Sequence, residues 1–395
     1  MDTPESESGV VSGATAIVLR ASKFVGVAPL RFTRGCGDDY HVTVCRTAAI
    51  ISSIALITIR IPVVIRFLNN IFIDNKAGIF KSMQSVILFI FQFAVPMTIS
   101  SLGVFIGQYR MRRLLYIISQ LREINNHTGT EHLLEPKAWK VWTSVVFFAI
   151  WTFALHLGGA IMAIDAQGKP FYDILLCISF NLDLNIIDFL LMQHKVLFYN
   201  IVSTMKALNE RLNQHFFQEN CLCRAQLNEK NILPDDFIKV FHIIDVVHKF
   251  EDVILLLTLV SITFNIIVVV FFLSWMSTVL NGITNFVKLN IMMQGLFLIY
   301  HCIKIYILIE PCYKFNQEFH RTKSLLSRIL CQKSSFSQNT KWYSFVELVS
   351  MLTPPTFAPL GVITFGRPLL GSIAGVVSTF AMIIIQFRLK LKNIL

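Results

Sequence analysis

The sequence is poor in charge and lacks the short motifs of the common enzyme families. Only 15% of its 395 residues are Asp, Glu, Lys or Arg, against about a quarter in a typical soluble domain. It contains no glycine-rich phosphate loop, no His-Glu-x-x-His pair and no Gly-x-Ser-x-Gly turn. These absences argue against an enzyme, and we expect no cofactor.

A metal-binding pattern of cysteines is also missing. Cys221 and Cys223 are close together, but no second cysteine pair or histidine couple accompanies them at zinc-site spacing. We therefore expect no metal site. The remaining cysteines are scattered, at Cys36, Cys45, Cys177, Cys302, Cys312 and Cys331.

Long apolar runs are what the sequence has in abundance. Hydrophobic residues make up 54% of it, and several runs exceed the ~18 residues that mark a transmembrane helix. They predict an all-α, polytopic membrane protein with seven transmembrane helices. The predicted spans cover residues 42–68, 79–106 with a kink at Pro96, 139–163, 171–199, 253–280, 286–309 and 368–387.

Two of the connections keep a helical spacing of apolar residues. Between residues 196 and 249 this spacing predicts that the fourth and fifth helices continue far outside the bilayer, with a turn at 228–235 where Pro234 breaks the helix. Between 312 and 351 it predicts an extension of the sixth helix, a polar loop and a short helix over 342–352.

Basic residues give the orientation. Most lysines and arginines outside the spans fall in the N-terminal segment and in the second-to-third, fourth-to-fifth and sixth-to-seventh loops. Because such residues collect in cytoplasmic loops, we expect a cytoplasmic N-terminus and an extracellular C-terminus. The net charge of +11 is then explained by membrane topology, and no nucleic-acid partner is expected.

That orientation bears on two other classes of membrane protein. A seven-helix G-protein-coupled chemoreceptor has its N-terminus outside, and its Asp-Arg-Tyr and Asn-Pro-x-x-Tyr elements are not found here. It stays as an alternative. A transporter built from inverted repeats of broken helices is a further option, but no such repeats are visible.

Polar and aromatic side chains within the predicted spans are candidates for contact with a small organic ligand. For each of them, packing or a structural hydrogen bond is the alternative reading. Asp188, which shares a helix face with Asn181 and Asn185, is expected to pair with a lysine or arginine near the cytoplasmic interface. The ligand-binding candidates are Gln84, Gln92, Trp151, His156, Asp173, Asn181, Asp183, Asn265, Trp275, Asn290 and Gln294.

The last span carries a motif. Thr379-Phe380, five apolar residues and then Gln386-Phe387 resemble the ending of insect gustatory receptors, which have Tyr where this chain has Phe380. The approach to this helix, from Thr356-Phe357-Ala358 to Arg367-Pro368-Leu369-Leu370, is similar to the same family. So are Glu318-Phe319-His320-Arg321-Thr322 on the sixth-helix extension and Leu208-Asn209 with Leu212 on the fourth.

The resemblance implies a ligand-gated, non-selective cation channel related to insect odorant receptors. Such a channel is a homotetramer, or a heterotetramer with other gustatory receptors, in the plasma membrane of a sensory neuron dendrite. Its permeants would be monovalent and divalent cations, and its ligand a non-volatile tastant held between the second and sixth helices. Gln386 and Phe387 match the pore and gate positions. Thr379, Ile383 and Gln386 also follow i, i+4 and i+7, so they would form one stripe facing the pore.

The same resemblance divides the chain into four parts. Residues 1–41 form a cytoplasmic N-terminal segment, and 42–311 form helices one to six with the ligand cavity and intracellular extensions. Residues 312–367 are cytoplasmic anchor helices, and 368–395 are the pore-lining seventh helix with a short extracellular tail. Ala381 stands where the sugar-responsive subgroup tends to have Glu. This favours a bitter or plant secondary compound as tastant, with a sugar or fructose receptor as the alternative.

Overall fold

The computed structural model describes residues 8–72 except 36 and 38, 93–128, parts of 143–154, 170–217, 226–277, 285–332, 340–351 and 357–392. These residues form mainly helices. The elements are β1 (Ser8–Val11), α1 (Gly13–Phe24), β2 (Leu30–Arg34), β3 (Tyr40–Val44), α2 (Arg46–Phe72), α4 (Val95–Phe105), α5 (Gly107–Thr128), α7 (Pro170–Phe217), α8 (Gln226–Ser277), α9 (Asn285–Gln332), α10 (Thr340–Met351), a 3-10 turn (Pro359–Gly361) and α11 (Arg367–Lys392).

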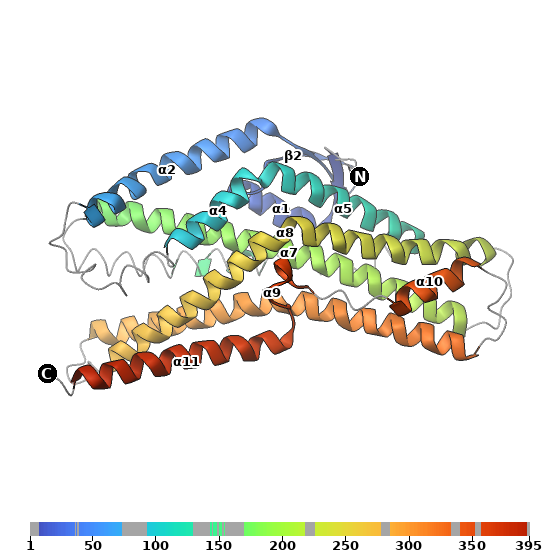
Figure 1. Cartoon of the computed structure of the whole chain (residues 1–395). Coiled ribbons are helices and arrows are strands. Elements are labelled where there is room, and N and C mark those ends of the chain that lie inside the picture. The colour runs from blue at the N-terminus through green and yellow to red at the C-terminus, as the bar shows by residue number, and fades with distance from the viewer. Residues whose placement is uncertain are drawn as a thin grey trace.

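Three very long helices, α7, α8 and α9, run through the whole length of the bundle (Figure 1). They contain 48, 52 and 48 residues, so each is more than about 70 Å long at ~1.5 Å per residue. A hydrocarbon core is only ~30 Å thick. Each helix is therefore more than twice as long as a membrane is thick, so the part of it that crosses a bilayer must continue well beyond, which confirms the predicted helix extensions.

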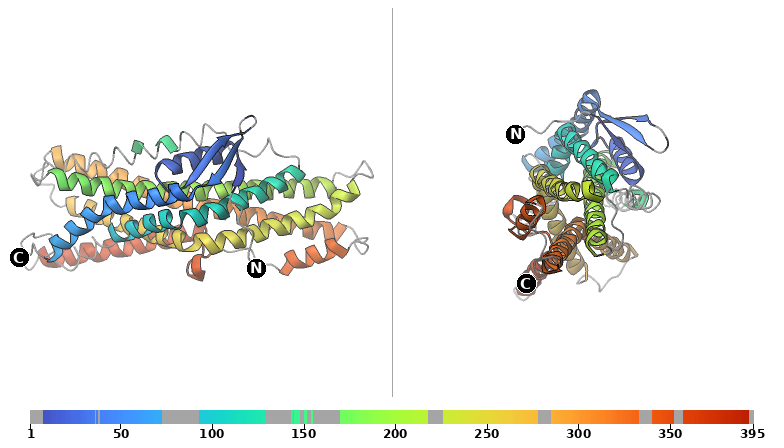
Figure 2. Two further views of the ribbon diagram at one scale, coloured as in Figure 1. Left: turned by 90° about the horizontal axis from the view of Figure 1, so that it is seen from above. Right: turned by 90° about the vertical axis from the view of Figure 1, so that its right-hand side faces the viewer.

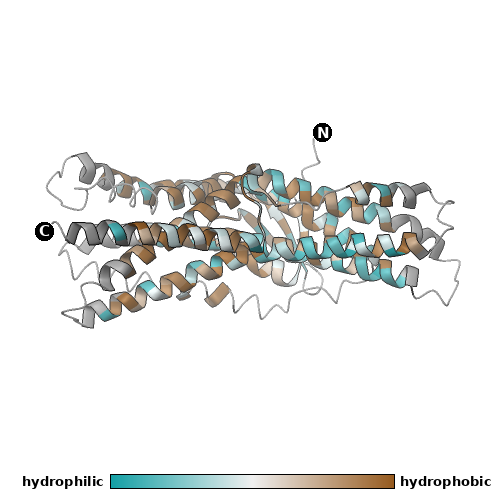
Figure 3. Ribbon diagram, turned by 60° about the horizontal axis from the view of Figure 1, so that its bottom comes forward, coloured by the Kyte–Doolittle hydropathy of each residue, from teal (hydrophilic) through white to brown (hydrophobic). Residues whose placement is uncertain are grey.

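The two halves of the bundle differ in polarity. The half that ends at the C-terminus is mostly apolar, and the other half mixes polar and apolar residues (Figure 3). Among the described residues, the stretches long and apolar enough to cross a membrane are Arg46–Ile65, Leu233–Leu273 and Ile291–Cys331, with shorter apolar helices at Val95–Phe105 and Arg367–Ile383. The apolar half is the membrane part of a polytopic helical protein, as predicted.

The turn predicted at 228–235 is wrong. Helix α8 begins at Gln226 and contains Pro234. A proline removes one backbone hydrogen bond but does not end a helix whose apolar side is well packed, and Leu233 and Phe237 on either side of it are buried. Pro96 likewise lies in the first turn of α4, where a missing N–H is tolerated.

A small N-terminal module, residues 8–45, was not predicted from the sequence. Helix α1 packs beside an antiparallel sheet of three strands in the order β1-β3-β2, in which Val42 pairs with both Gly9 and Phe32. Strand β3 includes residues 42–44, which were predicted as the start of the first span, and the helix itself begins at Arg46. Every second residue of β3 is apolar, which suits a strand covered on one face.

Candidate functional site

Helix α7 carries a row of buried polar side chains, at Asp183, Asp188 and Gln193. Each of the three meets a different neighbouring helix, so α7 connects α2, α9 and α5 through polar contacts. Charges in a membrane interior are expensive unless they are paired. The partners of this row therefore decide what it can do.

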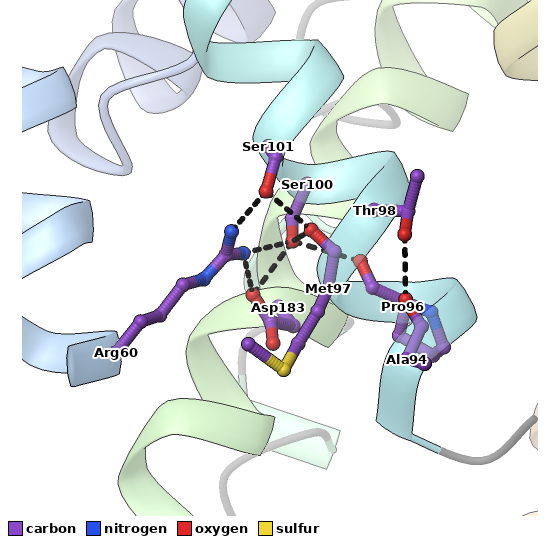
Figure 4. A network of polar contacts seen from close by, with 8 residues as sticks. All are labelled: Arg60, Ala94, Pro96, Met97, Thr98, Ser100, Ser101 and Asp183. Carbon is purple, nitrogen blue, oxygen red and sulfur yellow. Dashed lines mark hydrogen bonds and ion pairs between the residues drawn. The ribbon is translucent and has the colours of Figure 1, made fainter. Parts of the chain in front are cut away.

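Asp183 is held by α2 and α4 (Figure 4). The Arg60 guanidinium of α2 donates to Asp183 Oδ1, and the Ser100 hydroxyl of α4 donates to the same oxygen at 2.6 Å. Arg60 also donates to the hydroxyls of Ser100 and Ser101. Asp183 is 2% exposed and Arg60 8%. The pair thus brings no net charge into the bundle, and it ties α2 to α7.

Asp188 is paired with α9. Lys304 Nζ lies 2.7 Å from Asp188 Oδ1, and the Tyr300 hydroxyl donates to Oδ2. The Lys304 ammonium also sits 4.1 Å from the centre of the Tyr300 ring, close enough for a cation–π contact. The expectation that Asp188 pairs with a basic residue is confirmed.

A third buried cluster joins α5, α7 and α8. Arg110 Nε donates to Glu251 Oε1 at 2.7 Å, and another N–H of Arg110 donates to Gln193 Oε1. Both charged side chains are 1% exposed. Arg110 follows the second predicted span, over 79–106, and is read from the sequence as a loop residue, so this pair was missed. Its only sequence signal is the position of both residues beside predicted spans.

Some ligand-binding candidates can be placed. Asn265 is buried on α8 and donates to the Ser261 carbonyl of its own helix at 2.8 Å. Trp151 is half-buried, with its ring centre 5.1 Å from that of Phe147. Gln294 is half-buried on α9. On α7, Asn181 lies one turn before Asn185, whose amide donates to the Asn181 carbonyl at 2.8 Å, and two residues before Asp183.

The other candidates lie outside the described residues. Gln84, Gln92 and His156 are not described at all, nor are the side chains of Asp173, Trp275 and Asn290. Asn181 and Asp183 both lie on α7, but residues two apart on a helix point to different sides. Contact between a ligand and any of the eleven candidates stays a prediction.

The last helix, α11, is covered on one side only. Leu369 and Ile373 are buried and Val377 is half-buried, and this spacing of four residues forms one face, which packs mainly on α8. Away from that face, Thr379, Ile383 and Gln386 are exposed. Figures 1 and 2 show α11 along the outer edge of the bundle.

The uncovered part of α11 includes small residues as well. A methyl group added at Gly371 or Gly375 would meet nothing within 4 Å. The Thr379 hydroxyl donates to the Gly375 carbonyl at 2.8 Å. The side chain of Phe387, the predicted gate residue, lies outside the described residues.

The extensions of α7 and α9 are joined by a buried polar contact. The Asn209 amide donates to the Glu318 carbonyl and to Glu318 Oε2, both at 3.0 Å, and its oxygen accepts from the Thr322 hydroxyl at 2.8 Å. Nearby, Lys239 donates to Glu123 Oε1 at 2.8 Å, which lowers the pKa of the Glu123 carboxyl. Residues that carried the family resemblance in two separate stretches thus touch one another.

The segment before α11 is fixed to the centre of the bundle by aromatic side chains. The ring centre of Phe357 lies 4.6 Å from that of Phe198 on α7 and 6.2 Å from that of Phe315 on α9, and it stacks on His248 of α8 at 4.2 Å. A movement of α7, α8 or α9 can therefore be passed to the start of α11.

The fold and these contacts define a polytopic helical membrane protein with a separate outer helix. The sequence profile of the 7tm chemosensory receptor family matches residues 15–391. The chain therefore belongs to the 7tm chemosensory receptor family, and the resemblance to insect gustatory and odorant receptors drawn from its last helix is confirmed.

Solved structures with the same fold include that of the insect olfactory receptor OR5 from Machilis hrabei in complex with eugenol. It has a TM-score of 0.63 and 13% identity, over 94% of this chain and 97% of that one. A second structure of the same receptor gives a TM-score of 0.61 and 12% identity over the same shares. At this identity the likeness shows the fold alone. No curated protein matches the sequence.

Proposed function

We propose that this protein is a gustatory receptor that acts as a ligand-gated, non-selective cation channel for a non-volatile tastant. The observation that carries the proposal is the uncovered face of α11. Thr379, Ile383 and Gln386 are exposed there. The Thr379 hydroxyl is bonded to its own helix, but lipid would offer the Gln386 amide no hydrogen-bond partner. Polar groups in a span face protein or a water-filled path.

An assembly of identical or related chains would give these side chains both protein and a water-filled path to face. Four copies of α11 around one axis would cover the bare helix, place Gln386 beside permeating cations and bring apolar residues together below it. A ring of Ile383 or Phe387 side chains would close the path by excluding water. The bare surface at Gly371 and Gly375 would let neighbouring backbones approach closely, as small residues do between membrane helices.

A small organic ligand is supported by the family and by the fold. The olfactory receptor OR5 was solved in complex with eugenol, so this architecture accommodates a molecule of that size. For the tastant, Ala381 in place of the Glu of sugar-responsive relatives favours a bitter or plant secondary compound. Ligand binding would act on α8 and α9, which hold Phe357 and α11.

Electrical recording tests the proposal. Cells expressing the chain alone, and then with a second gustatory receptor, are exposed to alkaloids, plant glycosides and sugars. We expect a fast cation current in response to a member of the first two groups. Gln386→Ala should change the relative permeability of sodium and calcium several-fold, because the amide oxygen at the pore mouth is lost.

The matched control is Phe380→Ala, which shortens an exposed side chain about 120° away from Gln386 around α11. It should leave the permeability ratio unchanged. A current that is carried with the same ratio in wild type and in Gln386→Ala would contradict the pore assignment. A response that requires G-protein signalling would contradict the channel itself.

A further inference from the structure

Phe24, the last residue of α1, is 91% exposed. Phenylalanine is among the residues most often buried in folded proteins, and membrane-surface segments place such side chains against the lipid. The turn that follows is tightly built: Gly26 adopts a φ of 82° and its N–H donates to the Lys23 carbonyl at 3.0 Å. The exposed ring is thus presented on a fixed turn.

The level of this turn relative to the membrane follows from two contacts. A methyl group added at Gly26 would lie 3.1 Å from Ser52 of α2, and the Cys45 N–H donates to the Pro29 carbonyl at 2.8 Å. The apolar span in α2 begins at Arg46, and Ser52 lies about 9 Å further along the helix. Interfacial helices bury their apolar side chains ~5–10 Å deep, so Phe24 reaches the boundary between headgroups and acyl chains.

The surroundings of Phe24 match this position. On α2, Ile51 is exposed beside Ser52, and Ile50 and Ile54 are exposed on the side of the helix away from the turn, so apolar side chains face outward on α2 at the level of the turn. Lys23, next to Phe24, and Arg46, next to the Cys45 that bonds to Pro29, are both exposed. Basic residues at the cytoplasmic face are attracted by anionic lipid headgroups, and the N-terminal module lies on the side that the charge distribution makes cytoplasmic.

Contacts between the N-terminal module and the long helices hold the turn after α1 in place. The Thr15 hydroxyl accepts from Asn200 of α7 at 3.1 Å, and Arg122 of α5 forms a 2.8 Å ion pair with Asp39. Arg20 lies 3.7 Å from the centre of the Tyr40 ring. These contacts join α1 and the sheet to the long helices. The turn after α1 is therefore already folded when it meets the membrane.

We propose that the turn after α1 is a binding site for an anionic phospholipid of the cytoplasmic leaflet. Phe24 inserts among the acyl chains, and Lys23 and Arg46 bind the headgroup phosphate and carboxylate. The turn lies across the bundle from α11 (Figure 2). An assembly around α11 would therefore leave the turn facing lipid, and this one step rests on the proposed function.

Photocrosslinking in vesicles tests the site. The full chain, with photoreactive benzoylphenylalanine in place of Phe24, is reconstituted in equal parts of phosphatidylcholine and phosphatidylserine. After illumination, the adducts are identified by mass spectrometry. We expect lipid adducts enriched in phosphatidylserine by about fivefold for each basic residue involved. The double variant Lys23→Ala/Arg46→Ala should return the two lipids to equal shares.

Three matched controls define the outcomes. The photoreactive residue at Ile54, on the lipid face of α2, should give lipid adducts without preference, and at Thr33, exposed on β2, it should give none. Arg34→Ala removes an exposed charge at the far end of β2 and should keep the enrichment. Adducts of position 24 to another protein chain, or no lipid adduct there when Ile54 gives one, would overturn the insertion. Equal amounts of the two lipids among the adducts, with Lys23 and Arg46 both present, would overturn the anionic-lipid site.

Discussion

Asp183 depends on Arg60 to be buried as a charged group. Asp183→Ala would leave the Arg60 guanidinium without its carboxylate in the bundle interior, and breaking a buried pair on one side costs about 3–5 kcal/mol. We expect a large loss of thermal stability of the purified protein in detergent and poor delivery to the cell surface. Ser101→Ala, which removes one neutral partner of Arg60, should cost about 1 kcal/mol.

A double variant separates the ion pair from a ligand role. Arg60→Met/Asp183→Leu removes both charges and should recover most of the stability, because apolar residues of similar volume often replace a buried pair well. If Asp183→Ala were as stable as wild type and had lost only its ligand response, the carboxylate would be a ligand contact, as the sequence analysis allowed.

For single residues, the sequence indicated which charged groups are costly to bury but not which residues pair with them. Asp183 and Asp188 stand out because a carboxylate within a span needs a partner. The partners, Arg60 and Lys304, lie in other helices and become neighbours only when the bundle is assembled. Arg110 was not predicted to be buried, because it lies beyond the end of the second apolar run and was read as a loop residue.

Among the helices, the contact of Asn209 with Glu318 and Thr322 joins α7 to α9 outside the membrane. Asn209→Ala leaves the Thr322 hydroxyl and the Glu318 groups without this partner, and such a change costs about 1–3 kcal/mol. We expect faster amide hydrogen exchange in the α9 extension, from Pro311 onwards, with exchange in the membrane half unchanged. His320→Ala, on the exposed side of the same turn, is the control. Equal exchange in the two variants would contradict a joining role for Asn209.

Helix length and helix breaks differed in how well the sequence predicted them. The apolar spacing over 196–249 and beyond 312 correctly gave helices longer than the membrane. The break at Pro234 failed because flanking residues such as Leu233 and Phe237 are packed, and packing overrides the local preference of proline. The sheet of β1, β2 and β3 was missed because its strands are short and one of them adjoins a long apolar run that reads as a span.

For the molecule as a whole, the arrangement of contacts separates a connected bundle from a single outer helix. Helices α7, α8 and α9 pack along one another and hold most of the buried polar pairs. Helix α11 is attached through one face and through the Phe357 segment. Within the described part of the chain, α11 packs mainly on α8 and α9, so it can shift while the contacts among α7, α8 and α9 remain, which suits a gate moved by a ligand elsewhere in the bundle.

The last prediction concerns that gate. Ile383 is 41% exposed in the single chain, and a ring of such side chains would keep a closed pore dry. Ile383→Ser would place hydroxyls in the ring and let water and ions enter without ligand. We expect a constant cation leak in the recordings, blocked by the same pore blockers as the ligand response. Ala381→Ser adds the same hydroxyl on the half-buried, opposite side of the helix, about 160° away from Ile383, and should show no leak. A leak of the same size in both variants would point to general damage to α11. No leak in either variant would show that Ile383 does not form the constriction, and Phe387 would remain as the candidate.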